Sequence, residues 1–304
     1  MKVRLIGAGA VGAAVGKQLE KHCDFAFIVD EERKERYSRK PLLVNGEEIN
    51  IPLITPDKAD KADLILVALK NFQLDSALSM IEPFVGEKTT ILSLMNGIDS
   101  EALLSDAFGC DKVIYGFTLV SSLHVDNKIT TSDVKVRLGE KDNSKSERIL
   151  SVAKLFNESG IEATIPDDIR KALWIKFMRN VSQNSISAIL GATYGELLNN
   201  ESYKKAAFMV TKEVVRVGNA EGVNLTEEDA YSNVYSWGCM DEVGKSSTLQ
   251  DVEAARRTEN DYFCHEVSSL GKKHNIPTPN CDIVGAMVDA ASYISEYRKN
   301  RKRQ

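Results

Sequence analysis

MKVRLIGAGAVGAAVG, residues 1–16, decides the fold of this chain. A short apolar strand at 3–6 runs into three spaced glycines and then into a helix of small residues. Gly7 permits a tight turn, Gly9 lets the backbone approach a pyrophosphate, and Gly12 allows the helix to pack closely on the strand. This is the GxGxxG pattern in the context that a dinucleotide-binding loop requires. We therefore predict phosphate binding by the backbone of Gly7, Ala8, Gly9, Ala10, Val11 and Gly12.

A second apolar strand, at 25–29, ends in Asp30. An acidic side chain about 20 residues beyond the glycine loop binds the ribose 2′-hydroxyl of NAD and disfavours the 2′-phosphate of NADP. Arg33, Lys34 and Arg36 follow, and they could bind that phosphate if the loop turns inwards. The residues alone leave NADP or NAD open as the cofactor, and Asp30 favours NAD.

Further strands are predicted at 64–69, 90–94, 113–120 and 135–139, with a helix at 149–159. The alternation of strands and helices predicts an α/β fold with a doubly wound, mostly parallel sheet. Side chains just beyond the carboxyl ends of parallel strands face the ligand crevice. This places Lys70, Gln73 and Asn96 at the cofactor, although Asn96 and the glycine after it could equally form a turn.

From Asp167 onwards the sequence predicts helices only. The first, IRKALWIKFMRNVSQNSISAILG at 169–191, carries Lys176, Asn180 and Asn184 at intervals of four. At about 100° per residue, steps of four drift by only about 40°, so the three side chains share one stripe. A polar stripe on a strongly apolar helix predicts either polar groups that pair with these side chains or a water-filled cleft beside them. The alternative is an ordinary solvated face.

Later helices are predicted at 202–221, near residue 226, and from about 248 to 275. Ser246 and Ser247, with Gln250 three residues after Ser247, resemble a capping box at the start of the last helix, so Ser247 could be a cap and nothing more. Glu259 lies on a stripe of that helix that should be partly buried. A partly buried Glu and a partly buried Lys offset each other's desolvation, which makes Lys176 and Glu259 a candidate acid/base pair.

Composition narrows the class of protein. The 304 residues, 43% of them hydrophobic, suggest two domains, which we place at 1–166 and 167–304. The 39 basic and 44 acidic residues leave a net charge of −5, so no nucleic acid is expected. No run of about 18 apolar residues and no secretory leader is found, so we expect no membrane partner and a cytoplasmic location. Cysteines and histidines lack metal-ligand spacing, and no metal is expected.

Five stretches of the chain together resemble the ketopantoate reductase family: GAGAVG at 7–12, ALKNFQ at 68–73, LMNG at 94–97, WIKFMRNVSQNSISAILGATYGEL at 174–197 and KSSTLQDVEAARRTENDY at 245–262. The resemblance covers essentially the whole chain. It implies an N-terminal Rossmann domain, an all-helical C-terminal domain and an active site in the cleft between them. It also implies reduction of 2-dehydropantoate (ketopantoate), a small 2-oxo acid, to (R)-pantoate in pantothenate and coenzyme A synthesis, with NADP as the usual cofactor. A homodimer is possible.

The family resemblance also assigns roles to the residues. Lys176 would be the proton donor to the ketone oxygen, and Asn180, Asn184 and Ser247 would hold substrate oxygens. Asn96 and Glu259 would sit where cofactor and substrate meet. These roles make chemical sense, because hydride transfer puts negative charge on the former carbonyl oxygen, and an ammonium both stabilises and protonates it.

Two residues depart from the family pattern. Asp30 stands where the family usually has a basic residue for the NADP phosphate, and Tyr194 stands where some members place an Asn before GEL. Both allow an alternative, an NAD-dependent D-2-hydroxyacid dehydrogenase of the same fold and chemistry. A second alternative is a dinucleotide-binding regulator without turnover, which would be indifferent to the loss of Lys176.

Overall fold

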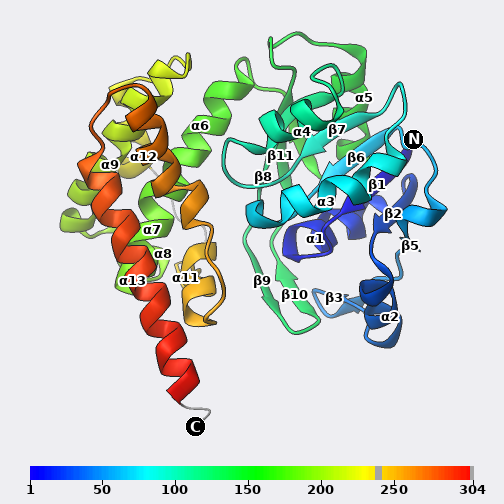
Figure 1. Ribbon diagram of the computed structural model, residues 1–304, viewed down its shortest axis with the longest axis horizontal. Helices are drawn as coiled ribbons and strands as arrows, with labels where there is room; N and C mark the ends of the chain where they lie inside the picture. The colour runs from blue at the N-terminus through cyan, green and yellow to red at the C-terminus, as the bar shows by residue number, and fades with distance from the viewer. Residues whose placement is uncertain (237–241, 302–304) are drawn as a thin grey trace. The chain divides into compact units, whose positions relative to one another are not determined.

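The computed structural model describes residues 1–236 and 242–301 (Figure 1). It divides into two compact units, Met1–Arg170 and Lys171–Gln304. The division falls within the first turn of helix α6 (Ile169–Arg179), slightly beyond the expected boundary after residue 166. The first unit is α/β and the described part of the second is helical, so the predicted fold class is confirmed.

The first unit is built on an eight-stranded sheet in the order β12-β11-β8-β7-β6-β1-β2-β5. Its strands are β1 (Lys2–Ile6), β2 (Asp24–Ile28), β5 (Leu53–Ile54), β6 (Leu64–Val67), β7 (Thr90–Ser93), β8 (Val113–Leu119), β11 (Lys135–Gly139) and β12 (Glu162–Thr164). The run from β8 to β5 is parallel, whereas β11 pairs antiparallel with β8 and parallel with β12. The mostly parallel sheet predicted from the sequence is therefore observed.

Helices cover both faces of this sheet. Successive residues of a strand point to opposite faces, so neighbouring residues of β1 pack against different helices. On one face Val3 and Leu5 of β1 share a buried cluster with residues of α1 (Ala10–Leu19) and α5 (Glu147–Glu158). On the other face Ile6 shares a cluster with α3 (Leu74–Ile81) and α4 (Ser100–Phe108). Helix α2 (Glu31–Arg39) differs from these, since none of its residues is buried.

A small second sheet in the first unit was not predicted. Its order is β4-β3-β10-β9, with β3 (Leu43–Val44), β4 (Glu47–Glu48), β9 (Ser122–Val125) and β10 (Lys128–Thr131). Asn45 and Gly46 have φ of 52° and 83° and form the turn between β3 and β4, as hairpin turns with two left-handed residues require. Strands this short carry too little periodicity to be recognised, and β3 pairs with β10 from a distant part of the chain.

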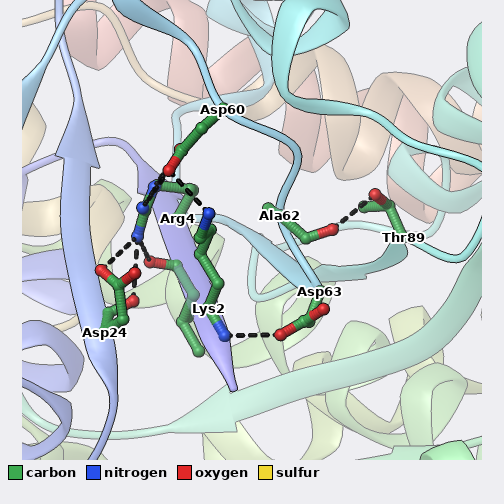
Figure 2. A network of polar contacts seen from close by, with 8 residues as sticks. Lys2, Arg4, Asp24, Asp60, Ala62, Asp63 and Thr89 are labelled. Atoms are coloured by element: carbon green, nitrogen blue, oxygen red, sulfur yellow. Dashed lines mark hydrogen bonds and ion pairs between the residues drawn. The ribbon is translucent and has the colours of Figure 1, made fainter.

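A buried arginine of β1 connects the first residue of β2 with the loop before β6 (Figure 2). The Arg4 side chain on β1 is only 4% exposed. Its guanidinium donates to the Asp24 carbonyl oxygen at 2.9 Å and to both carboxylate oxygens of Asp60 at 3.1 Å. Burial alone would raise the pKa of Asp60, but Lys2 and Arg4 hold it below its ordinary value. This network lies at the edge of the sheet opposite the glycine loop, and we interpret it as structural.

Replacing Arg4 by methionine is expected to lower the free energy of unfolding by about 2 kcal/mol, because the charge-assisted hydrogen bonds of its guanidinium to Asp24 and Asp60 are lost. Urea denaturation measures this. Lys2→Met is the matched control, since the Lys2 side chain is 34% exposed and binds the same Asp60. Its expected loss is below about 1 kcal/mol, and equal losses in the two variants would contradict the structural role of Arg4.

The described residues of the second unit form helices. After α6 come a π-helical segment (Asn180–Asn184), α7 (Ser185–Leu190), α8 (Tyr194–Leu198), α9 (Glu201–Ala220), α10 (Glu227–Tyr235), α11 (Ser247–Glu253), α12 (Cys264–Lys273) and α13 (Pro279–Arg301). The long α13, red in Figure 1, packs against α7, α9, α11 and α12. The expected helices at 202–221 and near residue 226 correspond to α9 and α10.

Two of the helix predictions need correction. The helix expected from about 248 to 275 is interrupted, because α11 ends where Ala255 adopts a left-handed φ of 49° and Arg256 N donates to the Asp251 carbonyl at 2.8 Å. Glu259 therefore lies outside α11, and the helical stripe on which it was predicted does not exist. The helix expected at 169–191 is continuous along the chain, but its centre is a π-helix, so the four-residue spacing no longer gives a simple stripe there.

Candidate functional site

The glycine loop has the geometry of a phosphate-binding turn. Gly7 has φ of 106°, and a Cβ at this position would lie 2.3 Å from the Ala68 carbonyl oxygen. A Cβ at Gly12 would lie 1.9 Å from the Gly7 carbonyl oxygen, so side chains are excluded at both positions. At Gly9 a Cβ would meet nothing within 4 Å, and no side chain caps the first turn of α1. Open space before bare helix amides fits the pyrophosphate of a dinucleotide.

The loops after β6 and β7 lie at the same sheet edge as the glycine loop, because β1, β6 and β7 are adjacent and parallel. Lys70 begins the loop after β6, and Gln73 Oε1 accepts a hydrogen bond from Lys70 N at 3.2 Å. Asn71 Nδ2 donates to the Asn96 carbonyl at 3.0 Å and joins the two loops. The strand order reverses direction between β1 and β6, which is where doubly wound sheets bind their ligands.

Asp30 lies at the carboxyl end of β2 and caps α2. Its carboxylate accepts a hydrogen bond from Arg33 N at 2.6 Å and forms an ion pair with the Arg33 guanidinium. Lys34 pairs with Glu31 at 3.5 Å, and Arg36 donates to the Tyr37 hydroxyl at 3.3 Å. The three basic residues that could have bound an NADP phosphate thus have partners within α2.

An acidic pair, Asp99 and Glu101, lies at the start of α4. Glu101 is 1% exposed and accepts a hydrogen bond from the Ser100 hydroxyl at 3.0 Å. Burial, together with the charge of Glu101, raises the pKa of Asp99 from 3.8 to about 6. Asp99 precedes α4 but makes no side-chain capping bond to it. Its ionisation at neutral pH therefore opposes folding.

Asp99→Asn is expected to stabilise the protein at pH 7 and to have little effect below pH 4. A carboxyl with a raised pKa holds its proton in the folded state after the unfolded state has lost it, so its contribution to stability falls as pH rises from about 4 to about 6. The gain at pH 7 should be on the order of 1–3 kcal/mol. Urea denaturation of both proteins between pH 4 and pH 7 measures it, and a difference independent of pH would contradict this account.

In the second unit, the predicted polar stripe falls on the π-helical segment. Asn180 and Asn184 are 7% and 8% exposed, and Asn184 Nδ2 donates to Asn180 Oδ1 at 3.1 Å. The solvated-face alternative is therefore wrong for these two residues. Lys176 lies one turn before them in α6 and is partly buried. Single π turns inside helices occur frequently at functional sites.

Helix α11 is held against this segment by a serine. Ser246, and not Ser247, is the N-cap, because its hydroxyl accepts from Leu249 N at 3.1 Å. The same hydroxyl contacts the Asn184 carbonyl at 3.3 Å and the Ser187 hydroxyl at 3.2 Å. Ser247 is the first helical residue, so the alternative that it is only a cap is wrong, and its assignment to substrate stays a prediction.

Glu259 is 3% exposed and begins a short 3-10 turn (Asn260–Tyr262). The neighbouring Asn260 side chain donates to the Gly285 carbonyl at 2.9 Å and to Asp289 Oδ1 at 2.7 Å, both on α13. Cys264 Sγ contacts the Val181 carbonyl at 3.6 Å. The segment that carries Glu259 is thus anchored both to α13 and to the π-helical segment. The pairing of Lys176 with Glu259 stays a prediction.

The predicted residues therefore fall into two sets. The glycine loop, Asp30, Lys70, Gln73 and Asn96 lie in the first unit; Lys176, Asn180, Asn184, Ser247 and Glu259 lie in the second. Arg179 and Gln183, which are adjacent to the stripe and also spaced four apart, were missed, although this spacing was the available signal. Within residues 1–236 and 242–301, no cluster of three or more His, Cys, Asp or Glu could hold a metal, and no helix could cross a membrane.

Comparisons with known proteins cover both units. The family model described as ketopantoate reductase PanE/ApbA matches residues 3–143, and its C-terminal counterpart matches 168–292. A 2-dehydropantoate 2-reductase from Streptococcus pyogenes serotype M3 is 30% identical over 95% of this chain and 97% of its own length. A solved complex of D-mandelate dehydrogenase with NADH is 25% identical, with a TM-score of 0.86 over 96% of this chain and 99% of that one. The 2-dehydropantoate 2-reductase from Geobacter metallireducens, at 23% identity, covers 96% of this chain and 100% of that one, and shares the fold with a TM-score of 0.81.

A phosphate-binding glycine loop at the switch point of a parallel sheet, followed by a helical unit with a buried polar set, defines the class: the chain is an NAD(P)-dependent oxidoreductase. It belongs to the ketopantoate reductase family.

Proposed function

We propose that this protein reduces the ketone of a small 2-oxo acid, with ketopantoate as the first candidate substrate and (R)-pantoate as the product. The first unit binds the nicotinamide dinucleotide and the second unit binds the acid. The observation that carries the proposal is the buried Asn180–Asn184 pair one turn from Lys176. The chain that carries it aligns with 97% of the length of a 2-dehydropantoate 2-reductase, at 30% identity. Buried amides beside a lysine suit an oxygen-rich substrate.

The residues act on charge and on orientation. When bound, the reduced nicotinamide supplies a hydride. The Lys176 ammonium stabilises the negative charge that develops on the ketone oxygen and donates a proton to it. Asn180, Asn184 and Ser247 offer neutral hydrogen bonds that orient the oxygens of the acid without competing with that charge. Glu259, which is buried, is the proposed partner of Lys176, and in such a pair each charge offsets the desolvation of the other.

NADH is our proposed cofactor, because the Asp30 carboxylate accepts hydrogen bonds but repels a phosphate. Asp30→Ser keeps a capping hydroxyl and removes the charge. The ratio of kcat/KM with NADH to kcat/KM with NADPH should fall by about 10-fold or more, as the loss of a charged hydrogen bond to ribose predicts. The control is Glu31→Gln, whose side chain is 70% exposed and pairs only weakly with Lys34. A ratio that Asp30→Ser leaves unchanged would show that Asp30 does not choose the cofactor.

A second candidate keeps the chemistry and changes the substrate: an NAD-dependent D-2-hydroxyacid dehydrogenase. Asp30 favours it, as does the likeness to D-mandelate dehydrogenase bound to NADH. Steady-state rates with ketopantoate and with phenylglyoxylate, each with NADH and with NADPH, separate the two. We expect ketopantoate to have the higher kcat/KM. A large preference for phenylglyoxylate with NADH would select the second candidate and reject the first.

Two further properties are also proposals. We place the protein in the cytoplasm, and we expect a homodimer. Light scattering coupled to size-exclusion chromatography measures the second, and a mass near the 33.6 kDa of one chain would contradict it.

A further inference from the structure

Three side-chain N–H donors without a hydrogen-bond partner fall within five residues of the chain, at the end of α6 and in the π-helical segment after it. They are Arg179 Nε, Asn180 Nδ2 and Gln183 Nε2, and each atom is fully buried with no hydrogen-bond partner in the described parts of the chain. Gln183 is 4% exposed and Asn180 is 7% exposed. A buried donor without an acceptor costs about 1–3 kcal/mol. Three of them within five residues indicate a position built for an acceptor that is not part of the protein.

The charge of Arg179 indicates the kind of acceptor. Burial lowers the pKa of its guanidinium, and the groups that act in the opposite direction are the phenols of Tyr194 and Tyr203. The described residues place no carboxylate in an ion pair with this side chain. Arg179 is partly exposed as a residue, but its Nε–H is buried without an acceptor, and the donor belongs to a positive charge. Such a donor is suited to an anion.

The position of these donors relates the anion to the proposed reaction. Arg179 follows Lys176 by three residues, which is about 4.5 Å along the helix axis. Residues three apart on a helix are neighbours on its surface. Asn180 directly follows Arg179 in the chain, and Gln183 lies about one turn further on. Both belong to the π-helical segment.

We propose that Arg179 and Gln183, with Asn180 Nδ2, bind a carboxylate of the substrate and make this chain selective for acids over neutral ketones. The inference rests on the proposed function for the identity of the substrate but not for the anion site itself. Arg179 acts as a specificity residue, and Lys176 keeps its role as proton donor.

The test measures anion binding without turnover. Oxalate, titrated into the full chain and followed by calorimetry, should bind the unaltered protein. Arg179→Met should weaken oxalate binding by about 30-fold or more, because a charge-assisted hydrogen bond is lost. Arg298→Met, which removes an exposed arginine of α13, is the control and should bind oxalate normally. Oxalate affinity that is unchanged in Arg179→Met would overturn the proposal.

Stability separates a binding role from a structural one. Without ligand, Arg179→Met and Gln183→Leu should melt at the same temperature as the unaltered protein or higher, because each removes an unpaired buried donor. Gln183→Leu keeps the charge and should still weaken oxalate binding several-fold, which preserves the test if Arg179→Met does not fold. Lower melting temperatures with full oxalate affinity would show that both side chains are structural.

Substrate comparison identifies which carboxylate is bound. If Arg179→Met lowers kcat/KM for 2-oxobutanoate but not for its methyl ester, the carboxylate beside the ketone is the ligand. If only 2-oxoglutarate is affected, a second carboxylate is the ligand. Equal losses for acid and ester would overturn the proposal. Oxalate binding that depends on Arg179 in a protein that reduces no oxo acid would reject the proposed function and leave the anion site standing.

Discussion

Lys176→Ala is expected to lower kcat by about 10³-fold or more and to change the dissociation constant of NADH by less than about threefold. The variant removes both the charge that stabilises the developing oxyanion and the proton that neutralises it, and each contribution is commonly worth about 10²-fold or more. We propose that the cofactor binds the first unit, which the substitution leaves intact. Steady-state rates and fluorescence titration of NADH measure the two effects.

Lys171 supplies a matched control on the same helix. Its ammonium forms an ion pair with Asp229 at 2.9 Å, and its side chain is 30% exposed. Lys171→Ala should keep kcat within about threefold. Lys176→Arg keeps the charge at position 176 but holds its proton too tightly to donate it, so it should recover only part of the lost rate. A fully active Lys176→Ala would favour the regulator alternative and remove Lys176 from catalysis.

Glu213→Leu is expected to lower the free energy of unfolding by about 3–5 kcal/mol. Glu213 on α9 is 1% exposed, and its carboxylate caps the amino terminus of α13. It accepts from Asn280 N at 3.1 Å, from Asn280 Nδ2 at 2.6 Å and from Cys281 N at 2.8 Å. Leucine would leave these donors unpaired and the helix dipole without its negative charge.

Glu213→Gln and Glu201→Gln calibrate this loss. Glu213→Gln keeps one acceptor and should cost about 1–2 kcal/mol, since the capping geometry survives while the charge is lost. Glu201→Gln removes a carboxylate from the same helix whose side chain is 68% exposed, and its cost should stay below about 1 kcal/mol. Urea denaturation measures all three variants. A cost for Glu213→Leu no larger than that for Glu201→Gln would refute the capping role.

The fold could be predicted where hydrophobic patterning extends over several residues. The strands β1, β2, β6, β7, β8 and β11 and the helices α5 and α9 are of this kind, whereas the two-residue β5 and the three-residue β12 were not predicted. The interruption between α11 and α12 was not predictable. Ala255 adopts the left-handed conformation there, and this conformation is normally occupied by Gly or Asn. The β3–β10 pairing was missed for another reason, since it joins very short strands that are far apart in the sequence.

The candidate site divides in the same way. The glycine loop could be recognised because its backbone geometry requires glycine at fixed positions, and the structure shows the clashes that side chains would create at Gly7 and Gly12. The burial of Asn180 and Asn184 was foreseen from their helix, but the π-helical turn was not, since no residue type marks it. Glu259 was predicted to be buried for a wrong reason: it lies in a 3-10 turn anchored by Asn260.

Hydride transfer to an oxo acid is the central claim, and isotope labelling tests it most directly. The protein is incubated with 4,4-dideuterated NADH and with ketopantoate or phenylglyoxylate, and the products are examined by NMR and mass spectrometry. We predict one deuterium on C2 of a 2-hydroxy acid, in a reaction that Lys176→Ala almost abolishes. NADH that binds the protein while no deuterium reaches either acid would contradict the account.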